Sequence, residues 1–283
     1  MGRFSVSPAP WRAALVSHLE AMDSPTFVLS SLHREPPSAA TQPPAALQKK
    51  DAETFSPRAR TVVYRSMWAG LSSNPRNPAP PNPHIYQTDL LTTTTDVRMD
   101  KVSEMFPALT NAAETASSCA GEHVEGVIWA ANAKTQWRIR GRVFMIGPDI
   151  ESDAAQPVRE ALKAYMRRQH AGNREADAEA DTWDWAKELT AHFGNLSPVM
   201  RGSFRNPPPG TPISQTPSSG LGLGQKVENL HDEIARSNFR VLVIVPEQVD
   251  QVDLSDPERG RRWRYDLTTQ GDEVTWTTTE LWP

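Results

Sequence analysis

Short runs of apolar and β-branched residues recur along the chain and predict strands. Runs that are rich in apolar and β-branched residues are typical of strands. The clearest is the apolar stretch around Val241–Val245, which predicts a buried strand. The expected strands are residues 26–32, 61–67, 84–94, 239–245 and 274–281.

Other segments place apolar residues at helical spacing. Trp11, Leu15, Leu19 and Met22 follow one another at intervals of three or four after Pro8 and Pro10, which predicts an opening helix. Further helices are expected at residues 100–106, at 157–168, and on the stripe formed by Trp185, Leu189 and Phe193.

A β-hairpin is expected around Asn132–Lys134, with arms at residues 124–131 and 136–146. In the second arm, apolar residues and a glycine occupy the odd-numbered positions, and Gln and Arg occupy the even-numbered positions. This alternation predicts an antiparallel strand with one buried and one polar face. The buried set is Trp137, Ile139, Gly141, Val143 and Met145, and the polar set is Gln136, Arg138, Arg140 and Arg142.

The 25 prolines are clustered rather than spread evenly. Proline cannot donate a ladder hydrogen bond, so the clusters predict irregular loop insertions near residues 34–57, 73–84 and 206–225. Antiparallel strands with helices between them predict an α+β barrel rather than a doubly wound parallel sheet. We expect residues 1–283 to form a single domain that contains these insertions.

Composition excludes several function classes. The chain has 30 Lys+Arg and 34 Asp+Glu, a net charge of −4, so a general nucleic-acid binder is not expected. Its one cysteine, Cys119, excludes an internal disulfide and a cysteine-based zinc site, and the seven histidines show no metal-ligand spacing. With no long apolar run, we expect a cytoplasmic protein without a membrane segment or a bound metal.

Two segments carry residues suited to binding an anion. Arg60 and Arg65 bracket Thr61, Val62 and Val63, but five positions apart on a strand they point to opposite faces; a solvated edge strand is the simpler interpretation of this segment alone. Residues 92–102 combine four threonines with Arg98 and Lys101 at the start of a helix. They suit an anion site or an ordinary Thr-rich strand with an Asp cap.

Further candidates give weaker signals. The amide of Gln136 can read a ring edge that offers a donor and an acceptor, although a Gln on an exposed strand is usually solvated. Residues 259–265 contain four arginines and two aromatic residues, which suit phosphate or nucleic acid but are also typical of a local site or a solvated turn. The glycines at 220–224 are interpreted as a linker, because no strand precedes them.

Taken in order, these segments resemble the pyridoxamine 5′-phosphate oxidase-like flavoproteins, in the branch of FMN-binding domain proteins. The pieces span nearly the whole chain, and their order is more specific than any one of them. They are Ala9–Arg12, Arg60–Arg65, Thr95–Arg98 with Lys101 and Val102, Gln136–Arg142, Leu196–Pro198 with Pro208–Gly210, residues 239–250, Arg261–Tyr265 and residues 276–283.

The resemblance implies a split β-barrel that binds FMN at the interface of a homodimer. The strand from Arg60 to Arg65, with Thr61, Val62 and Val63, would lie along the flavin. Thr95 and Lys101 match phosphate contacts, Gln136 matches a ring contact, and Arg264 matches a C-terminal arginine that reaches the cofactor. Arg65 is the candidate for stabilising the negative charge of the reduced ring.

Two departures from the family pattern affect the expected function. Met99-Asp100-Lys101 stands where the oxidases have Ser-Arg-Lys, so Arg98 would have to supply the missing charge. No histidine follows His231, so the C-terminal Arg-x-His element that the oxidases use for their substrate is absent. FMN binding is therefore better supported than oxidation of pyridoxamine phosphate, and no catalytic residue is assigned.

Three functions remain open. The first is an FMN-dependent oxidoreductase acting on an unidentified small-molecule substrate. The second is a non-catalytic module that holds FMN or another phosphorylated ligand. The third is an interaction protein that docks partners through its proline-rich loops.

Overall fold

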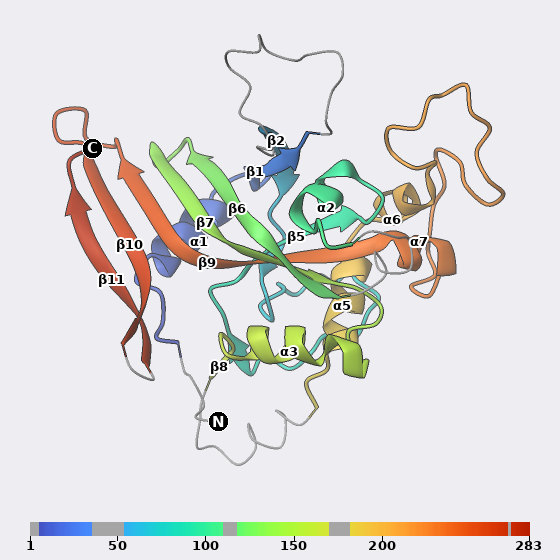
Figure 1. Cartoon of the computed structure of the whole chain (residues 1–283). Coiled ribbons are helices and arrows are strands. Elements are labelled where there is room, and N and C mark those ends of the chain that lie inside the picture. The colour runs from blue at the N-terminus through green and yellow to red at the C-terminus, as the bar shows by residue number, and fades with distance from the viewer. Residues whose placement is uncertain (1–5, 36–53, 110–117, 170–181, 271–272) are drawn as a thin grey trace, which may run out of the picture.

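The computed structural model describes residues 6–35, 54–109, 118–169, 182–270 and 273–283 (Figure 1). Within them a large antiparallel sheet runs in the order β11-β10-β9-β7-β6-β1-β2. Its strands are β1 (Thr26–Arg34), β2 (Phe55–Val63), β6 (Cys119–Ala130), β7 (Thr135–Ile146), β9 (Phe239–Asp253), β10 (Arg261–Gln270) and β11 (Glu273–Leu281).

The sheet bends into a barrel that does not close. Strand β9 also pairs with β5 (Leu91–Asp96), and β5 pairs in turn with the two-residue strand β3 (Ser66–Met67). The chain therefore leaves β2 at Val63 and joins β5 at Ser66, and the barrel stays split between β2 and β5. A separate ribbon is formed by β4 (Tyr86–Gln87) and β8 (Arg167–Arg168). This is the α+β split barrel that the sequence predicts.

Six α-helices surround this sheet in the described residues: α1 (Arg12–Glu20), α2 (Asp100–Met105), α3 (Gln156–Lys163), α5 (Trp185–Gly194), α6 (Pro198–Gly202) and α7 (Glu233–Asn238). Three begin at side-chain caps, because Asp184, Ser197 and Asp232 each accept a hydrogen bond from a backbone N–H of the first turn. Helices α5, α6 and α7 gather at one end of the sheet (Figure 1). None of the described helices is long and apolar enough to cross a membrane.

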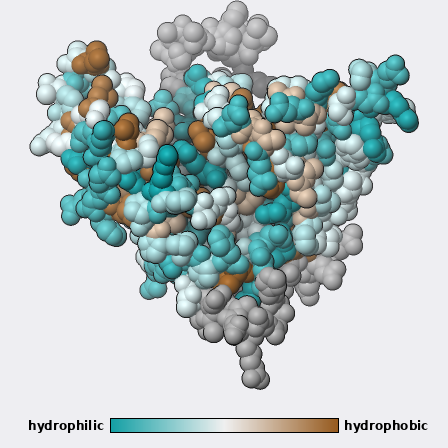
Figure 2. All heavy atoms as spheres, turned by 180° about the vertical axis from the view of Figure 1, so that it is seen from behind, coloured by the Kyte–Doolittle hydropathy of each residue, from teal (hydrophilic) through white to brown (hydrophobic). Residues whose placement is uncertain are grey.

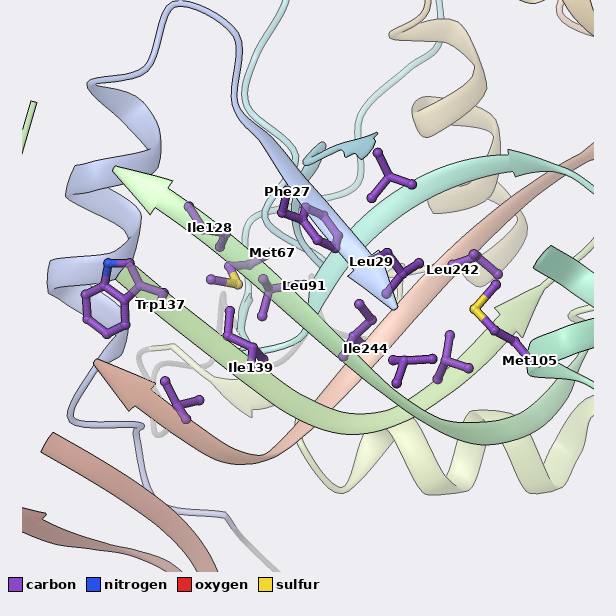
Figure 3. Packing of buried hydrophobic residues seen from close by; sticks show 14 of the residues in the cluster. Phe27, Leu29, Met67, Leu91, Met105, Ile128, Trp137, Ile139, Leu242 and Ile244 are labelled. Carbon is purple, nitrogen blue, oxygen red and sulfur yellow. The ribbon is translucent and has the colours of Figure 1, made fainter. Parts of the chain in front are cut away.

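Two hydrophobic cores lie on opposite faces of β9. Leu91, Leu242 and Ile244 point into the barrel, where they join Phe27, Leu29 and other residues (Figure 3). Val241, Val243 and Val245 point the other way, into a core formed with the helices. The apolar run of β9 is buried on both sides for this reason, and it continues as a half-exposed strand to Asp253.

Strand β7 shows where the predicted alternation holds and where it ends. From Gln136 to Arg142 the residues alternate between partly or fully exposed and buried, as the sequence predicts. Beyond Arg142, Phe144 and Ile146 are buried as well, because the helical core covers the face that is polar earlier in the strand.

Several predicted boundaries were wrong. The strand expected at 84–94 is broken between β4 and β5, where the buried carboxylate of Asp89 binds Arg167 through two contacts of 2.7 Å and accepts from the N–H of Ala9. The helix expected at 157–168 ends at Lys163, because Arg167 and Arg168 pair with β4.

The other differences concern where loops and strands begin. The strand expected at 61–67 is divided into β2 and β3 where the pairing partner changes. The insertion expected at 34–57 falls mostly outside the described residues, and β2 already begins at Phe55. Residues 73–84 and 206–225 contain neither helix nor strand, as expected, whereas the arginine-rich segment 259–265 is mostly strand β10 rather than a turn.

A buried histidine lies at the centre of the helical core. The ring of His192 is 1% exposed and stacks on Trp68, with ring centroids 5.7 Å apart and planes 8° from parallel. Neither ring nitrogen has a hydrogen-bond partner among the described residues. Burial lowers the pKa of His192 to about 3, with a smaller contribution from the positive charge of Arg65.

This histidine should make the fold sensitive to acid. Below pH 6.5 the unfolded chain gains a proton at residue 192 that the folded chain gains only near pH 3, so the contribution of His192 to the unfolding free energy falls through this window by about 1.4 kcal/mol per pH unit. His192→Phe keeps a stacked ring and removes the titration. We expect its loss of unfolding free energy between pH 7.5 and 5 to be smaller than that of the natural chain by about 1–2 kcal/mol.

Chemical denaturation at both pH values measures this difference. His231→Phe, at an exposed loop histidine, is the matched control. Equal acid sensitivity in His192→Phe and the natural chain would show that His192 is not buried in its neutral form.

Candidate functional site

A cavity of about 900 Å³ lies along the split between β2 and β5. On the barrel side it is lined by Thr61–Val63, Arg65, Thr94–Asp96, Met99 and Lys101. On the opposite side it is lined by Leu196, by Met200 of α6, and by residues of the segment that follows to Leu223. We call this opposite side, formed by lining residues between 196 and 223, the outer wall.

The barrel side exposes two strand edges. Among the described residues β2 pairs only with β1, and β5 pairs with β3 only at Leu91 and Thr92. The edges of residues 61–63 and 93–96 therefore face the split without a strand partner in that part of the chain. Backbone N–H and C=O groups on such edges are available to hydrogen-bond a ligand.

Arg65 is placed where the two edges meet. Its backbone N–H donates to Thr92 O at 2.9 Å, and its Nε donates to Thr94 Oγ1 at 3.2 Å. Arg65 lines the main cavity. Burial lowers the pKa of Arg65, but a guanidinium remains charged in a protein, so a cation lies at this end of the split.

Lys101 provides a second cation. It lies in the first turn of α2 and lines both the main cavity and an adjoining cavity of about 580 Å³. Burial lowers the pKa of Lys101, as does the nearby charge of Arg60, while Asp96 and Glu104 oppose this change. The lysine is thus a largely desolvated cation that an anionic ligand would stabilise.

The one carboxylate that lines the main cavity, in the part of the chain described, is already paired. Asp96 accepts from Arg98 Nη2 at 2.6 Å and from Arg98 Nε at 2.9 Å. Arg98 also donates to the carbonyl oxygens of Asn206 and Phe204, at 3.0 and 3.3 Å. Arg98 therefore neutralises Asp96 and holds the outer wall. Its expected role at a phosphate stays a prediction, which this geometry does not support.

Arg60 is directed to α2 rather than into the main cavity. It forms an ion pair with Glu104, whose side chain is buried, and its Nη1 lies 2.5 Å from Ser31 Oγ. Arg60 lines only the adjoining cavity, together with Lys101. Arg60 therefore borders the adjoining cavity and not the main one, and the carboxylate of Glu104 neutralises part of its charge.

Gln136 and Arg264 do not line the cavity within one chain. Gln136 pairs with Val252 and Arg264 with Asp250 on β9, whereas β5, which lines the cavity, pairs with the other end of β9, at residues 239–244. Arg264 pairs with Asp266 at 2.9 Å. The neighbouring arginines are paired as well, Arg261 with Glu280 and Arg262 with Asp250, so the cluster at 259–265 is not a free cationic patch.

Of the ten predicted site residues, the main cavity brings together Thr61, Val62, Val63, Arg65, Thr95 and Lys101. Sequence reasoning missed the outer wall, although the proline cluster at 207–217 marks it. Those prolines predict a surface loop, but a sequence does not show which loop folds back over a site.

Comparison with known proteins shows which family the barrel resembles. Residues 8–147 match the family model of the pyridoxamine 5′-phosphate oxidase FMN-binding domain. Residues 8–147 of the chain belong to the pyridoxamine 5′-phosphate oxidase-like FMN-binding family. Nine of the ten predicted site residues, all except Arg264, lie within the matched part, whereas the outer wall lies outside it.

Two known proteins are similar to this chain over almost its whole length. The uncharacterized protein YGR017W of Saccharomyces cerevisiae is 22% identical, over 95% of this chain and 100% of the relative. The crystal structure of a pyridoxamine 5′-phosphate oxidase-related, FMN-binding protein from Nostoc punctiforme is 19% identical, with a TM-score of 0.51, over 98% of this chain and 99% of that one. The structural likeness supports the fold of this chain.

Proposed function

We propose that this chain binds FMN in the cavity between β2 and β5 and uses it to oxidise or reduce a small-molecule substrate. One observation carries the proposal. Two largely buried cations, Arg65 and Lys101, line a cavity at two open strand edges, inside the region that matches an FMN-binding family.

The residues present suit a flavin mononucleotide. The volume of about 900 Å³ lies within the range of small-molecule sites. Because Arg98 neutralises Asp96, the charges of Arg65 and Lys101 remain for a phosphate and an electron-rich ring. The open strand edges and the hydroxyls of Thr61 and Thr95 offer donors and acceptors. When bound, FMN supplies the hydride chemistry, while the protein supplies position and electrostatics.

A homodimer forms part of the proposal. The outer face of the sheet carries exposed apolar side chains at Val28, Leu32 and Trp129, which are 39, 58 and 50% exposed. The strand register places Thr61 opposite Val28 and Gln136 opposite Trp129, so this face extends from the cavity edge to Gln136. A second copy on this face would cover the apolar residues, and it would explain how Gln136 and Arg264 contribute to a site they do not reach in one chain.

Partner docking through the proline-rich loops receives less support. The 73–84 segment is bound to α5, because Asn77 Nδ2 donates to Ala191 O and Asn82 Nδ2 donates to Glu188 Oε2. Most residues of the 206–218 segment line the cavity. Both segments therefore have roles within this fold.

Removing the charge of Lys101 should weaken FMN binding. A hydrogen bond to a charged group contributes about 1.5–3 kcal/mol, so Lys101→Ala should raise the dissociation constant for FMN about 10–100-fold. Titration of the purified protein, followed by flavin fluorescence, measures it. Lys163→Ala, at an exposed lysine of α3, is the matched control. An unchanged dissociation constant in Lys101→Ala would contradict the proposed phosphate contact.

Arg65 should set the reduction potential of the bound flavin. Arg65→Gln keeps a donor for Thr94 and removes the positive charge that would stabilise the reduced anion. We expect the midpoint potential to fall by about 30 mV or more, since 30 mV corresponds to 1.4 kcal/mol for a two-electron couple. Equilibration with a reference dye measures the potential, and Arg76→Gln, at an exposed loop arginine, is the control. A potential equal to that of the control would disprove this role.

The outer sheet face should be the dimer interface. Trp129→Glu places a charge among the exposed apolar residues, so we expect a monomer by light scattering after size exclusion, with weaker FMN binding. Val199→Glu, at another exposed apolar residue on α6, should leave the dimer intact. A dimer that persists in Trp129→Glu would place the interface elsewhere.

A further inference from the structure

The outer wall of the cavity differs in chemistry from the barrel side. Among the described residues, the charged side chains that line the cavity are Arg65, Asp96 and Lys101, and all lie on the barrel side. The lining residues of the wall are apolar or uncharged: Leu196, Met200, Ser203, Phe204, Asn206–Pro209, Thr211–Ile213, Gln215–Ser218, Gly222 and Leu223. A ligand that fills this cavity therefore meets cations on one side and an uncharged surface on the other.

The two arginines within the wall segment are turned away from the cavity. Arg201 is buried and donates to the carbonyl oxygens of Val227 and Gly194, at 2.8 and 3.2 Å. Arg205 pairs with Asp232 at 2.9 Å and donates to Gly220 O. Neither lines the cavity, so neither supplies a charge to a ligand at the wall.

Hydrogen bonds hold the wall in this position. Arg98 donates to Phe204 O and Asn206 O, Gly222 N donates to Arg205 O at 2.9 Å, and Gln225 Nε2 donates to Gly222 O at 3.0 Å. The prolines restrict the backbone further. Gly202 allows the close approach, because a Cβ there would lie 1.9 Å from Gln225 O.

Two apolar side chains of the wall are exposed to solvent in a single chain. Ile213 is 101% exposed and Leu223 is 77% exposed, and both line the cavity. They belong to the segment that projects at the upper right of Figure 1, and Figure 2 shows the molecule from the other side. An apolar molecule at the wall would bury part of their surface, which is favourable.

We infer that the substrate is an uncharged, largely apolar molecule that binds against the outer wall, and that the wall determines this specificity. The inference rests on the proposed function, in which FMN occupies the cations of the barrel side. A phosphorylated substrate would then place its charge against an uncharged surface, which is costly without a partner.

A pair of probes that differ only in the phosphate tests the inference. The FMN-loaded full chain is titrated with 1-naphthol and with 1-naphthyl phosphate, and binding is followed by the change in flavin absorbance. We expect 1-naphthol to bind at least tenfold more tightly. Equal or tighter binding of 1-naphthyl phosphate, or no binding of 1-naphthol up to its solubility limit, overturns the inference.

A charge placed on the wall should reverse this preference. Leu223→Lys supplies the missing cation at an exposed position, so we expect the ratio of the two affinities to shift at least tenfold towards 1-naphthyl phosphate. Leu254→Lys, at an exposed leucine that does not line the cavity, is the matched control and should keep the natural ratio. The same ratio in both variants overturns the role of the wall.

The FMN titration of each preparation separates the two proposals. Failure of the natural chain to bind FMN overturns the proposed function, and with it the inference. Normal FMN binding combined with a preference for 1-naphthyl phosphate overturns the inference alone.

Discussion

The change of pairing partner after Val63 is the constraint on which the site depends. β2 pairs with β1 as far as Val63, and three residues later Ser66 pairs with Thr92 of β5. The chain stops pairing with β1 before it starts pairing with β5. The edge of β2 and the edge of β5 therefore diverge from the Ser66–Thr92 pair and leave a gap between them. Backbone polar groups on these edges need partners. The split is thus a place where a ligand can replace a missing strand.

Ion pairs decide which cations remain for a ligand. The sequence contains many arginines, but the fold pairs several of them with carboxylates: Arg60 with Glu104, Arg98 with Asp96, Arg262 with Asp250 and Arg264 with Asp266. Arg65 is positioned by a threonine hydroxyl instead of a carboxylate, and Lys101 lies among charges of both signs. A count of cations in the sequence therefore overstates the positive charge of the site, and only the contacts show where that charge remains.

Local patterns predicted the elements well, and long-range contacts limited the rest. Alternation along β7 gave its buried and polar faces, but only the helical core explains why Phe144 and Ile146 are also buried. The order of motifs indicated the family and six residues that line one cavity. It did not show that Arg98 also binds the wall, because the carbonyl groups that accept from Arg98 lie more than a hundred positions away.

The cavity is assembled from two stretches of sequence that are far apart in the chain. The barrel side comes from residues within the part that matches the family model, and the outer wall comes from residues beyond it. The two meet through a few bonds, chiefly from Arg98 to main-chain oxygens, which any side chain at Phe204 or Asn206 would still offer. An exchange of the wall segment would thus leave the barrel side of the cavity unchanged, so the two halves can vary independently of each other.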